Sequence, residues 1–439
     1  MSKVVKFGGS SLASAEQFKK VGNIIRADKE RKYVVPSAPG KRFSDDTKVT
    51  DMLYACYDLA DQGKSFKAEL DAIKARYQEI IDGLQLDLDL VDEFKTIEKN
   101  FKAKAGSNYA ASRGEYLNGI IMANYLGYDF IDAATVIFFD ENGEFDAAKT
   151  NEVLRARLAE SKEAVVPGFY GAMPDGTVKT FSRGGSDITG SIVAKAAKAD
   201  VYENWTDVSG FLIADPRIID HPEAIETITY RELRELAYMG ATVLHEDAIF
   251  PVRKEGIPIN IRNTNKPEDK GTLIVESTCQ KPEYTITGIA GKKGFVAVSI
   301  DKDMMNSEVG FCRKALQAFE ENGISIEHMP SGIDTMTVFV HQEEFEGKEQ
   351  QVISSIRRLT HPDVIDLEAD LGLIAVVGRG MKSTRGTAGR IFSALAHANI
   401  NVKMIDQGSS ELNIIIGVSN DDFEAAIKAI YDIFVETRL

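Results

Sequence analysis

The chain has 439 residues, of which 44% are hydrophobic and 27% are charged, and its net charge is −15. This length predicts two or three domains, and the acidic excess argues against nucleic acid or an anionic membrane as a partner. Three cysteines, Cys56, Cys279 and Cys312, lack metal or redox spacing, which indicates a reduced, cytoplasmic protein. No apolar run is long enough to span a membrane, and we expect no signal peptide.

The first predicted element is a short strand at residues 4–7 that carries Lys6 and ends at Gly8 and Gly9. The two glycines would let backbone N–H groups approach a phosphate closely, and the helix predicted after them adds partial positive charge at its N-terminus. Lys6 supplies a full charge. The alternative is a plain strand, turn and helix with a solvated lysine, since the order of residues is not that of a P-loop.

Strands and helices alternate through the next 270 or so residues, which predicts a mainly parallel sheet covered on both faces, with ligands at the carboxyl ends of its strands. We expect this domain to end near residue 283. The predicted elements are strands at 33–35, 135–139, 164–166, 257–262 and 272–275, helices at 49–59, 112–126 and 184–193, and a charged helical excursion at 62–106.

A second glycine turn, with Arg183 and Asp187 on either side of Gly184 and Gly185, opens the helix at 184–193. Two such turns facing each other across a crevice would suit phosphoryl transfer between two anions, where positioning and charge neutralisation carry most of the catalysis. Asp187 would hold Lys6 or bind the Mg²⁺ of a nucleotide. The alternative is that Asp187 only caps its helix.

The last third of the chain repeats itself at an offset of 76 residues. Each copy predicts the βαββαβ order of a ferredoxin-like module, at 284–370 and 371–439, with 284–298 a strand that both could share. We expect these modules to sense a ligand or to form a dimer, and the alternative is a purely structural tandem. Matching positions include Met305 with Met381, Gly310 with Gly386, Phe319 with Leu395, and Ile324 with Ile400.

Four sequence motifs, followed by the two modules, resemble the aspartate kinases of the amino-acid kinase family with tandem ACT domains. They are V-x-K-F-G-G-S-S-L, G-E-x-L, S-R-G-G-S-D-x-T and W-T-D-V-x-G-x-x-x-x-D-P-R. The resemblance spans essentially the whole chain. It implies a catalytic α/β domain at 1–283, with an open, mainly parallel sheet sandwiched by helices, and two ACT-like modules after it.

The resemblance also implies a reaction: transfer of the γ-phosphate of ATP, with Mg²⁺, to the side-chain carboxylate of L-aspartate. The products are 4-phospho-L-aspartate and ADP, in the first step of lysine, threonine and methionine biosynthesis. The carboxylate is already ionised at neutral pH, so no general base is needed. The implied catalytic residues are Lys6 and Asp187, the nucleotide-binding residues Lys6, Gly8, Gly9, Ser10, Thr206, Asp207 and Arg217, and the aspartate-binding residues Ser37, Thr50, Glu115, Arg183 and Ser186. No metal ligands of the protein's own are implied.

The chemistry of two of these residues agrees with their implied roles. Arg183 offers a planar fork for a carboxylate, and Glu115 a countercharge for an ammonium group. Two positions depart from the family pattern: Thr242 stands where a lysine is common, and Leu212 where an aromatic residue is common. The nucleotide-side assignments are therefore less direct than the aspartate-side ones.

In the first module, the resemblance implies feedback inhibition by lysine, alone or together with threonine. The implied effector-binding residues are Met304, Met305, Ser307, Gly310, Phe311, Glu327 and Ser331. Glu327 would meet a cationic side chain, and the alternative is a carboxylate that faces solvent. The modules of this family pair between subunits, so the resemblance implies a homodimer or a dimer of dimers.

Two other functions remain open from the sequence. One is a related kinase with a glutamate-type acceptor, which a comparison of acceptors would distinguish. The other is a non-catalytic amino-acid sensor, which the departures at Thr242 and Leu212 would fit but the presence of Lys6, Arg183 and Asp187 disfavours.

Overall fold

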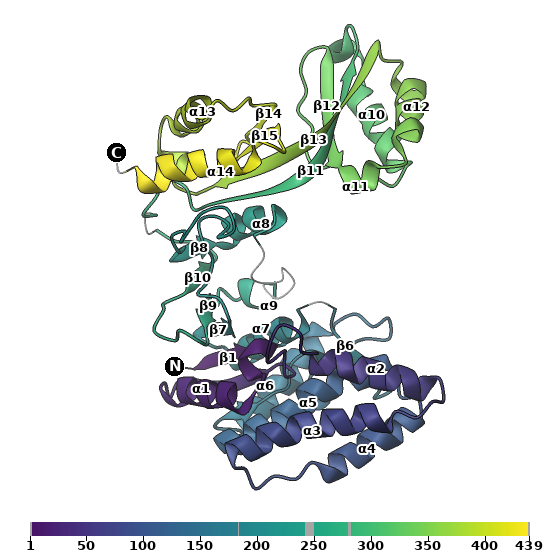
Figure 1. Ribbon diagram of the computed structural model, residues 1–439, viewed down its shortest axis with the longest axis vertical. Coiled ribbons are helices and arrows are strands. Elements are labelled where there is room, and N and C mark those ends of the chain that lie inside the picture. Colours follow the sequence, from purple (N-terminus) through teal and green to yellow (C-terminus); the bar gives the residue numbers. More distant parts are fainter. Residues whose placement is uncertain (1, 183, 242–249, 280–281, 438–439) are drawn as a thin grey trace. The chain divides into compact units, whose positions relative to one another are not determined.

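The structure is a computed structural model that describes residues 2–182, 184–241, 250–279 and 282–437 (Figure 1). Its residues form two compact units. The N-terminal unit comprises Met1–Phe211, Glu226–Tyr230 and Val243–Thr278, and the C-terminal unit comprises Leu212–Ile225, Arg231–Thr242 and Cys279–Leu439. Two short segments from the first two thirds of the chain therefore belong to the C-terminal unit.

The N-terminal unit contains an eight-stranded sheet in the order β3-β4-β2-β1-β7-β9-β10-β8. All neighbouring pairs are parallel except β9 with β10. The predicted mainly parallel sheet is thus confirmed. The strands are β1 (Lys3–Phe7), β2 (Arg31–Pro36), β3 (Asp129–Phe130), β4 (Ala164–Val165), β7 (Val201–Thr206), β8 (Thr227–Thr229), β9 (Ile259–Asn263) and β10 (Thr272–Val275).

Helices cover both faces of this sheet. On one face, apolar side chains of β1 and β2 share a core with α1 to α5, and on the other face α7 packs on β1, β2 and β7 (Figure 1). The charged region 62–106 forms two helices because each keeps a narrow apolar stripe, such as Phe94, Ile97 and Phe101 in α4. The helices of this unit are α1 (Ala15–Arg26), α2 (Val49–Asp61), α3 (Lys67–Leu84), α4 (Val91–Lys102), α5 (Ser107–Leu126), α6 (Ala147–Ala159), α7 (Gly185–Ala197) and α9 (Phe250–Arg253). All of α8 (Tyr230–Tyr238) after its first residue belongs to the C-terminal unit.

One predicted strand, at 135–139, is wrong. Residues Ala133–Thr135 form a 3₁₀ helix, and Phe138 and Phe139 make only isolated bridges. Phe139 packs against Phe145 and Phe181 instead. The apolar run is largely buried, but burial in a small aromatic cluster does not require a ladder of hydrogen bonds. A two-stranded hairpin, β5 (Tyr170–Ala172) with β6 (Val178–Thr180), lies next to this cluster in sequence.

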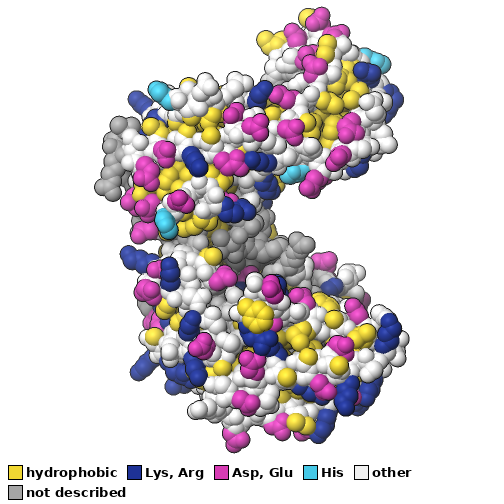
Figure 2. All heavy atoms as spheres, in the orientation of Figure 1, with side chains coloured by type: hydrophobic (Ala, Val, Ile, Leu, Met, Phe, Trp, Pro, Cys, Tyr) yellow, Lys and Arg dark blue, Asp and Glu magenta, His cyan; other side chains and the backbone are white. Residues whose placement is uncertain are grey.

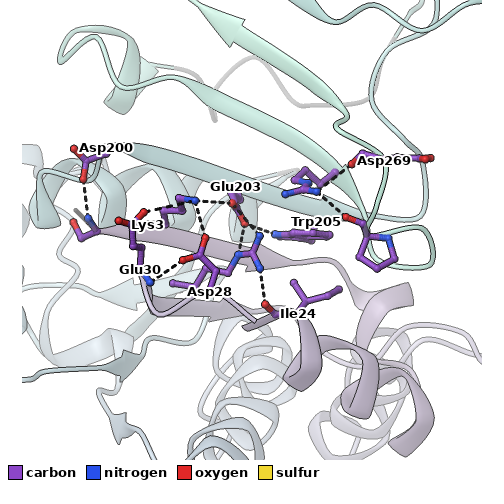
Figure 3. Close-up of polar contacts among 12 residues, drawn as sticks. Lys3, Ile24, Asp28, Glu30, Asp200, Glu203, Trp205 and Asp269 are labelled. Carbon is purple, nitrogen blue, oxygen red and sulfur yellow. Dashed lines mark hydrogen bonds and ion pairs between the residues drawn. The ribbon is translucent and has the colours of Figure 1, made fainter. Parts of the chain in front are cut away.

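A network of buried charges lies beneath the central strands, as Figure 3 shows. Glu203 on β7 accepts hydrogen bonds from Arg31 Nε and from Trp205 Nε1, both at 2.8 Å. Arg31 also lies over the Trp205 ring, and its Nη1 donates to the carbonyl of Ile24. The charges of Arg31 and Glu203 are paired with each other, as buried charges require. Its side chains therefore fix β2 and β7 to α1.

The C-terminal unit contains one antiparallel five-stranded sheet in the order β12-β11-β13-β15-β14. β11 (Gly288–Asp301) and β13 (Val364–Val377) are both 14 residues long, and β13 runs from the first copy of the repeat into the second. The two copies therefore build a single sheet. Its other strands are β12 (Thr335–His341), β14 (Met404–Asp406) and β15 (Asn413–Ser419), and its helices are α10 (Phe311–Glu320), α11 (Gln342–Phe345), α12 (Glu349–Thr360), α13 (Thr387–His397) and α14 (Phe423–Tyr431).

The repeat seen in the sequence is confirmed in the backbone of the two copies. Residues Met305–Ser307 and Met381–Ser383 each form a 3₁₀ helix. Gly310 and Gly386 each precede the following α-helix with φ of 86° and 83°, a left-handed conformation that favours glycine.

On the face that Figure 2 shows, Lys and Arg side chains are interspersed with Asp and Glu on both units. This face carries no broad patch of a single charge. None of the helices in the described residues is both long and apolar enough to cross a membrane.

Candidate active site

The turns that follow β1 and β2, the end of β7 and the start of α7 meet at the carboxyl edge of the central sheet. In the parallel ladder, Lys6 on β1 is in register with Val35 on β2 and Asn204 on β7. Side chains alternate along a strand, so Lys6 and Asn204 point to the face on which α7 packs. This edge is where ligands bind in open α/β sheets.

Lys6 and Asp187 form an ion pair at the centre of this edge. Lys6 Nζ lies 2.5 Å from Asp187 Oδ1, and the two side chains are 9% and 17% exposed. Asn204 donates from Nδ2 to the same Asp187 oxygen at 2.9 Å, and its Oδ1 lies 3.5 Å from Lys6 Nζ. Tyr202 donates to the Asp187 carbonyl at 3.1 Å, which fixes the first turn of α7 to β7. The predicted proximity of the two glycine turns is thus observed through Lys6 and Asp187.

The turn after β1 packs closely against the turn after β2. Gly40 N donates to Gly9 O at 2.8 Å, and a Cβ on Gly40 would lie 2.6 Å from the Gly9 carbonyl carbon, so no side chain fits there. Gly8 N donates to the Trp205 carbonyl at 3.0 Å and is already occupied. The amides of Gly9 and Ser10 begin the 3₁₀ helix Gly9–Leu12, and first-turn amides have no acceptor within their own helix.

Glu115, on α5, is the most perturbed carboxyl group of the site. It is 6% exposed, and burial raises its pKa to about 8, against the opposing effect of hydrogen bonds from the Ala38 amide and the Ser186 side chain. Its Oε2 has no hydrogen-bond partner among the described residues. A buried carboxyl with an unused oxygen is suited to a cationic group of a ligand.

Ser37 and Thr50 lie on the same side of the site as Glu115. Ser37 N donates to the Phe7 carbonyl at 3.1 Å, and Asn118 Nδ2 donates to the Ser37 carbonyl at 2.6 Å. Thr50 is in the first turn of α2 and is partly exposed. Gly114 packs against Ala38, the residue whose amide reaches Glu115. The loop after β2 is therefore held between α2 and α5.

Arg76, on α3, contributes to the site and was not anticipated from the sequence. It is 5% exposed, and its Nη2 donates to the carbonyls of Ala13 at 3.0 Å and Gly40 at 2.9 Å. Its Nη1 lies 3.2 Å from Asp46. The only signal in the sequence is a cation between apolar positions Ile73 and Tyr77 of an otherwise amphipathic helix.

The remaining residues predicted to bind the nucleotide belong to both units. Thr206 ends β7, and its hydroxyl donates to Asp207 at 3.1 Å. Arg217 belongs to the C-terminal unit, is largely exposed and pairs with Asp215 at 2.5 Å, so the pKa of Asp215 lies below its usual value. Arg183 and Thr242, both singled out in the sequence, lie outside the described residues.

In the C-terminal unit, the residues predicted to bind an effector differ in how exposed they are. Met305 and Phe311 are packed in the core of the first copy, whereas Met304 is 68% exposed. The Glu327 side chain is 9% exposed and does not face open solvent: His341 Nε2 lies 3.2 Å from its Oε1, and the Tyr238 hydroxyl also hydrogen-bonds to it. Ser307, Gly310 and Ser331 lie at or near the loops that flank these residues.

Comparison with known proteins places the chain among well-described relatives. Residues 1–263 match the amino acid kinase family and residues 374–434 match the ACT domain. Aspartokinase 3 of Bacillus subtilis is 40% identical, with 98% of both chains covered. The crystal structure of Clostridium acetobutylicum aspartate kinase, described as an allosteric enzyme, is 53% identical with a TM-score of 0.91, covering 98% of this chain and 99% of that one.

A more distant structure shares the fold. Aspartokinase III of E. coli in complex with lysine and aspartate is 24% identical, with a TM-score of 0.73 and 99% of both chains covered.

Proposed function

The chain belongs to the amino acid kinase family and is an aspartate kinase, and on this premise we propose which of its residues perform the reaction. The observation that carries the proposal is the pair of Lys6 and Asp187 at the meeting point of two glycine turns. A lysine there lies next to backbone amides, and these amides attract anions. The lysine and the amides both stabilise the negative charge on a phosphoryl group during its transfer.

Lys6 has the role of binding the transferring phosphoryl group, together with the amides of Gly9 and Ser10. Its side chain is almost fully buried, so its charge acts in a medium that screens it weakly. Gly8 serves differently from the original expectation, because its amide holds the end of β7 in place through the Trp205 carbonyl. Thr206, Asp207 and Arg217 remain proposed contacts of the nucleotide.

Asp187 is the carboxylate that fits the Mg²⁺ that accompanies ATP. Its Oδ1 is engaged by Lys6 and Asn204, and no partner of Oδ2 is found in the described part of the chain. Carboxylate oxygens are ligands that Mg²⁺ prefers, usually together with phosphates of the substrate. When bound, the ion supplies neutralisation of phosphate charge. Asp187 would also hold Lys6 in position before the nucleotide arrives.

Glu115 and Ser186 have the role of holding L-aspartate, with Ser37, Thr50 and Arg183. The free oxygen of Glu115 would accept a hydrogen bond from the α-ammonium group of aspartate. This contact requires the carboxylate form of Glu115, so the carboxyl group, whose pKa is about 8, must lose its proton. The side-chain carboxylate of aspartate then attacks the γ-phosphorus, its oxygen forms the new P–O bond, and ADP leaves.

A coupled assay of ADP release tests the choice of acceptor. With MgATP, L-aspartate should support turnover at least 100-fold faster than glutamate, acetylglutamate or carbamate. Preference for one of these would favour the related-kinase alternative. Binding of an amino acid without ADP release for any acceptor would favour the non-catalytic sensor.

The proposed regulation is feedback inhibition by lysine, alone or with threonine, at the first copy of the repeat. The low exposure of the Glu327 side chain, 9%, supports this, because a largely desolvated carboxylate can discriminate a cationic side chain. Calorimetric titration with each amino acid tests it, and no heat with either would contradict it. The division into 284–370 and 371–439, pairing of these modules in a dimer or dimer of dimers, and a cytoplasmic location are parts of the same proposal.

A further inference from the structure

Asn204 is a buried amide in the centre of the active site to which the proposed mechanism gives no role. It is 4% exposed and lies on the central strand β7. Strand interiors disfavour asparagine, whose side chain tends to bond to its own backbone. Here both ends of its amide are directed across the sheet, toward Lys6 on β1 and Asp187 on α7.

The two hydrogen bonds of Asn204 differ in strength. The bond from Nδ2 to Asp187 Oδ1 is 2.9 Å long and involves a charged acceptor, whereas the contact from Lys6 Nζ to Asn204 Oδ1 is 3.5 Å, at the limit of a hydrogen bond. The amide therefore acts mainly on the carboxylate. The Asn204 amide is neutral and its side chain is short, so the phosphate attracts it less than it attracts the long, charged side chain of Lys6.

We propose that Asn204 is a positioning residue that holds the Asp187 carboxylate in its catalytic orientation while Lys6 exchanges that carboxylate for the transferring phosphoryl group. In the free enzyme, Asp187 Oδ1 has two donors, Lys6 Nζ and Asn204 Nδ2. When Lys6 turns to the phosphate, the bond from Asn204 is the one that remains. A largely buried carboxylate without any donor would rotate or move toward water.

The backbone gives Asn204 a fixed position. Its strand neighbours Glu203 and Trp205 point to the opposite face, where Glu203 is bound by Arg31 and Trp205 (Figure 3). Tyr202 fixes the main chain of Asp187 separately. Only the side chain of Asp187 therefore depends on Asn204, so loss of the amide should disturb the carboxylate without displacing α7.

The test uses Asn204→Leu, which keeps the size of the side chain and removes both hydrogen bonds, and Asn204→Asp, which keeps the shape and the acceptor but removes the donor. We expect kcat to fall about 10- to 100-fold in Asn204→Leu and at least as far in Asn204→Asp. The KM values for aspartate and ATP should change less than about threefold. A kcat equal to that of the wild type in Asn204→Asp would overturn the inference.

Asn260→Leu is the matched control. Asn260 lies on the neighbouring strand β9, in register with Glu203, and its side chain packs near Gly271 on the other side of the sheet from Lys6. Its kcat should stay within about twofold of wild type. An equal loss of kcat in this control would show that polar residues of the sheet act only through stability.

A second measurement does not depend on turnover. Trp205 is the only tryptophan of the chain, and it follows Asn204 directly. Its fluorescence should report binding of a non-hydrolysable ATP analogue with Mg²⁺, with a Kd close to wild type in Asn204→Leu. A loss of binding that matches the loss of kcat would contradict a role in positioning.

This inference rests on the proposed roles of Lys6 and Asp187, and the experiments separate the two failures. Normal turnover in both Lys6→Met and Asp187→Asn would overturn the proposed function. Severe loss in those variants with normal turnover in Asn204→Leu would overturn only the role of Asn204.

Discussion

The N-terminal and C-terminal units each contain buried carboxylates, but these differ in how much of their bonding capacity is used. In the C-terminal unit, Glu232 on α8 is fully buried; its Oε1 accepts from Thr287 Oγ1 and from the Arg379 backbone amide, and its Oε2 from Arg379 Nη1. In the N-terminal unit, Glu115 Oε2 is buried and has no partner among the described residues, and the Lys6 and Asn204 groups that contact the partly exposed Asp187 carboxylate share its Oδ1.

This difference separates carboxylates that hold the fold from those that act on a ligand. A buried oxygen without a hydrogen-bond partner costs free energy of folding. Such an oxygen in the folded protein is therefore a candidate for binding a ligand. Burial alone does not distinguish the two, since Glu203 is as buried as Glu115 but is bound by Arg31 and Trp205.

The largest expected effect is on turnover in Lys6→Met. Removal of the charge that stabilises the phosphoryl group should lower kcat about 10²- to 10³-fold. Asp187 keeps its bond from Asn204 and some exposure to water, so we expect a loss of stability of less than about 2 kcal/mol. Steady-state kinetics and urea unfolding measure the two effects. A large loss of stability with normal kcat would show that the ion pair of Lys6 and Asp187 holds the fold, as that of Glu232 and Arg379 does, and would contradict the difference between the two units.

Glu232→Gln should have the opposite signature. It removes the negative charge that Arg379, with a side chain 18% exposed, pairs with, which we expect to cost about 2 kcal/mol. Hydrogen exchange of α8 and the unfolding midpoint of the C-terminal unit would measure this loss. We expect kcat at saturating substrate to change less than about threefold at 25 °C. Unchanged exchange in α8 would show that the satisfied pair is not structural.

Glu327→Gln sharpens the comparison within the C-terminal unit. Loss of a charge-assisted bond to a lysine side chain should raise the Kd of lysine about 10- to 100-fold, while uninhibited activity stays near wild type. Calorimetry measures the affinity, and inhibition curves provide the functional counterpart. Equal affinity in the variant would exclude Glu327 from the effector site. His341→Gln, which removes the other member of the pair, serves as the matched control.

Glu115 gives an effect that is small at pH 8 and grows as pH falls. Its pKa of about 8 in the free protein means that it binds a proton over most of the neutral range. Aspartate requires the ionised form, so KM for aspartate should rise about tenfold for each pH unit below 8, and binding should release a proton. Calorimetry in buffers of different ionisation enthalpy measures that proton. Glu115→Gln should have a high KM without this pH dependence.

The same pKa shift predicts how stability depends on pH. The folded protein holds the Glu115 proton between about pH 4.5 and pH 8, whereas the unfolded chain releases it near pH 4.5. The stabilisation from the neutral carboxyl is therefore complete below pH 4.5 and is lost as pH rises to about 8. Relative to wild type, Glu115→Gln should become more stable as pH rises through this range, as unfolding at several pH values would show.

The sequence predicted features that depend on neighbouring residues. Ser14 and Gln17 have the spacing of a capping box, and Ser14 does cap α1 by accepting from Gln17 N, whereas the Gln17 side chain turns to Asn265. The positions of the glycine turns and the offset of the repeat were also correct, because spacing and left-handed backbone conformations are local properties. The strand at 135–139 failed because an apolar run does not specify whether it is buried by a ladder or by packing.

Only the tertiary structure decided which distant residues meet. Lys6 and Asn204 are 198 positions apart, and Arg76 joins Ala13 to Gly40 across three segments. No local pattern encodes such contacts, because they depend on the order of strands in the sheet and on how closely the turns pack. The two copies of the repeat likewise merge into one sheet because β13 continues through the boundary between them. The sequence by itself thus determined the elements and the chemistry available, and packing determined which charged groups kept an oxygen free.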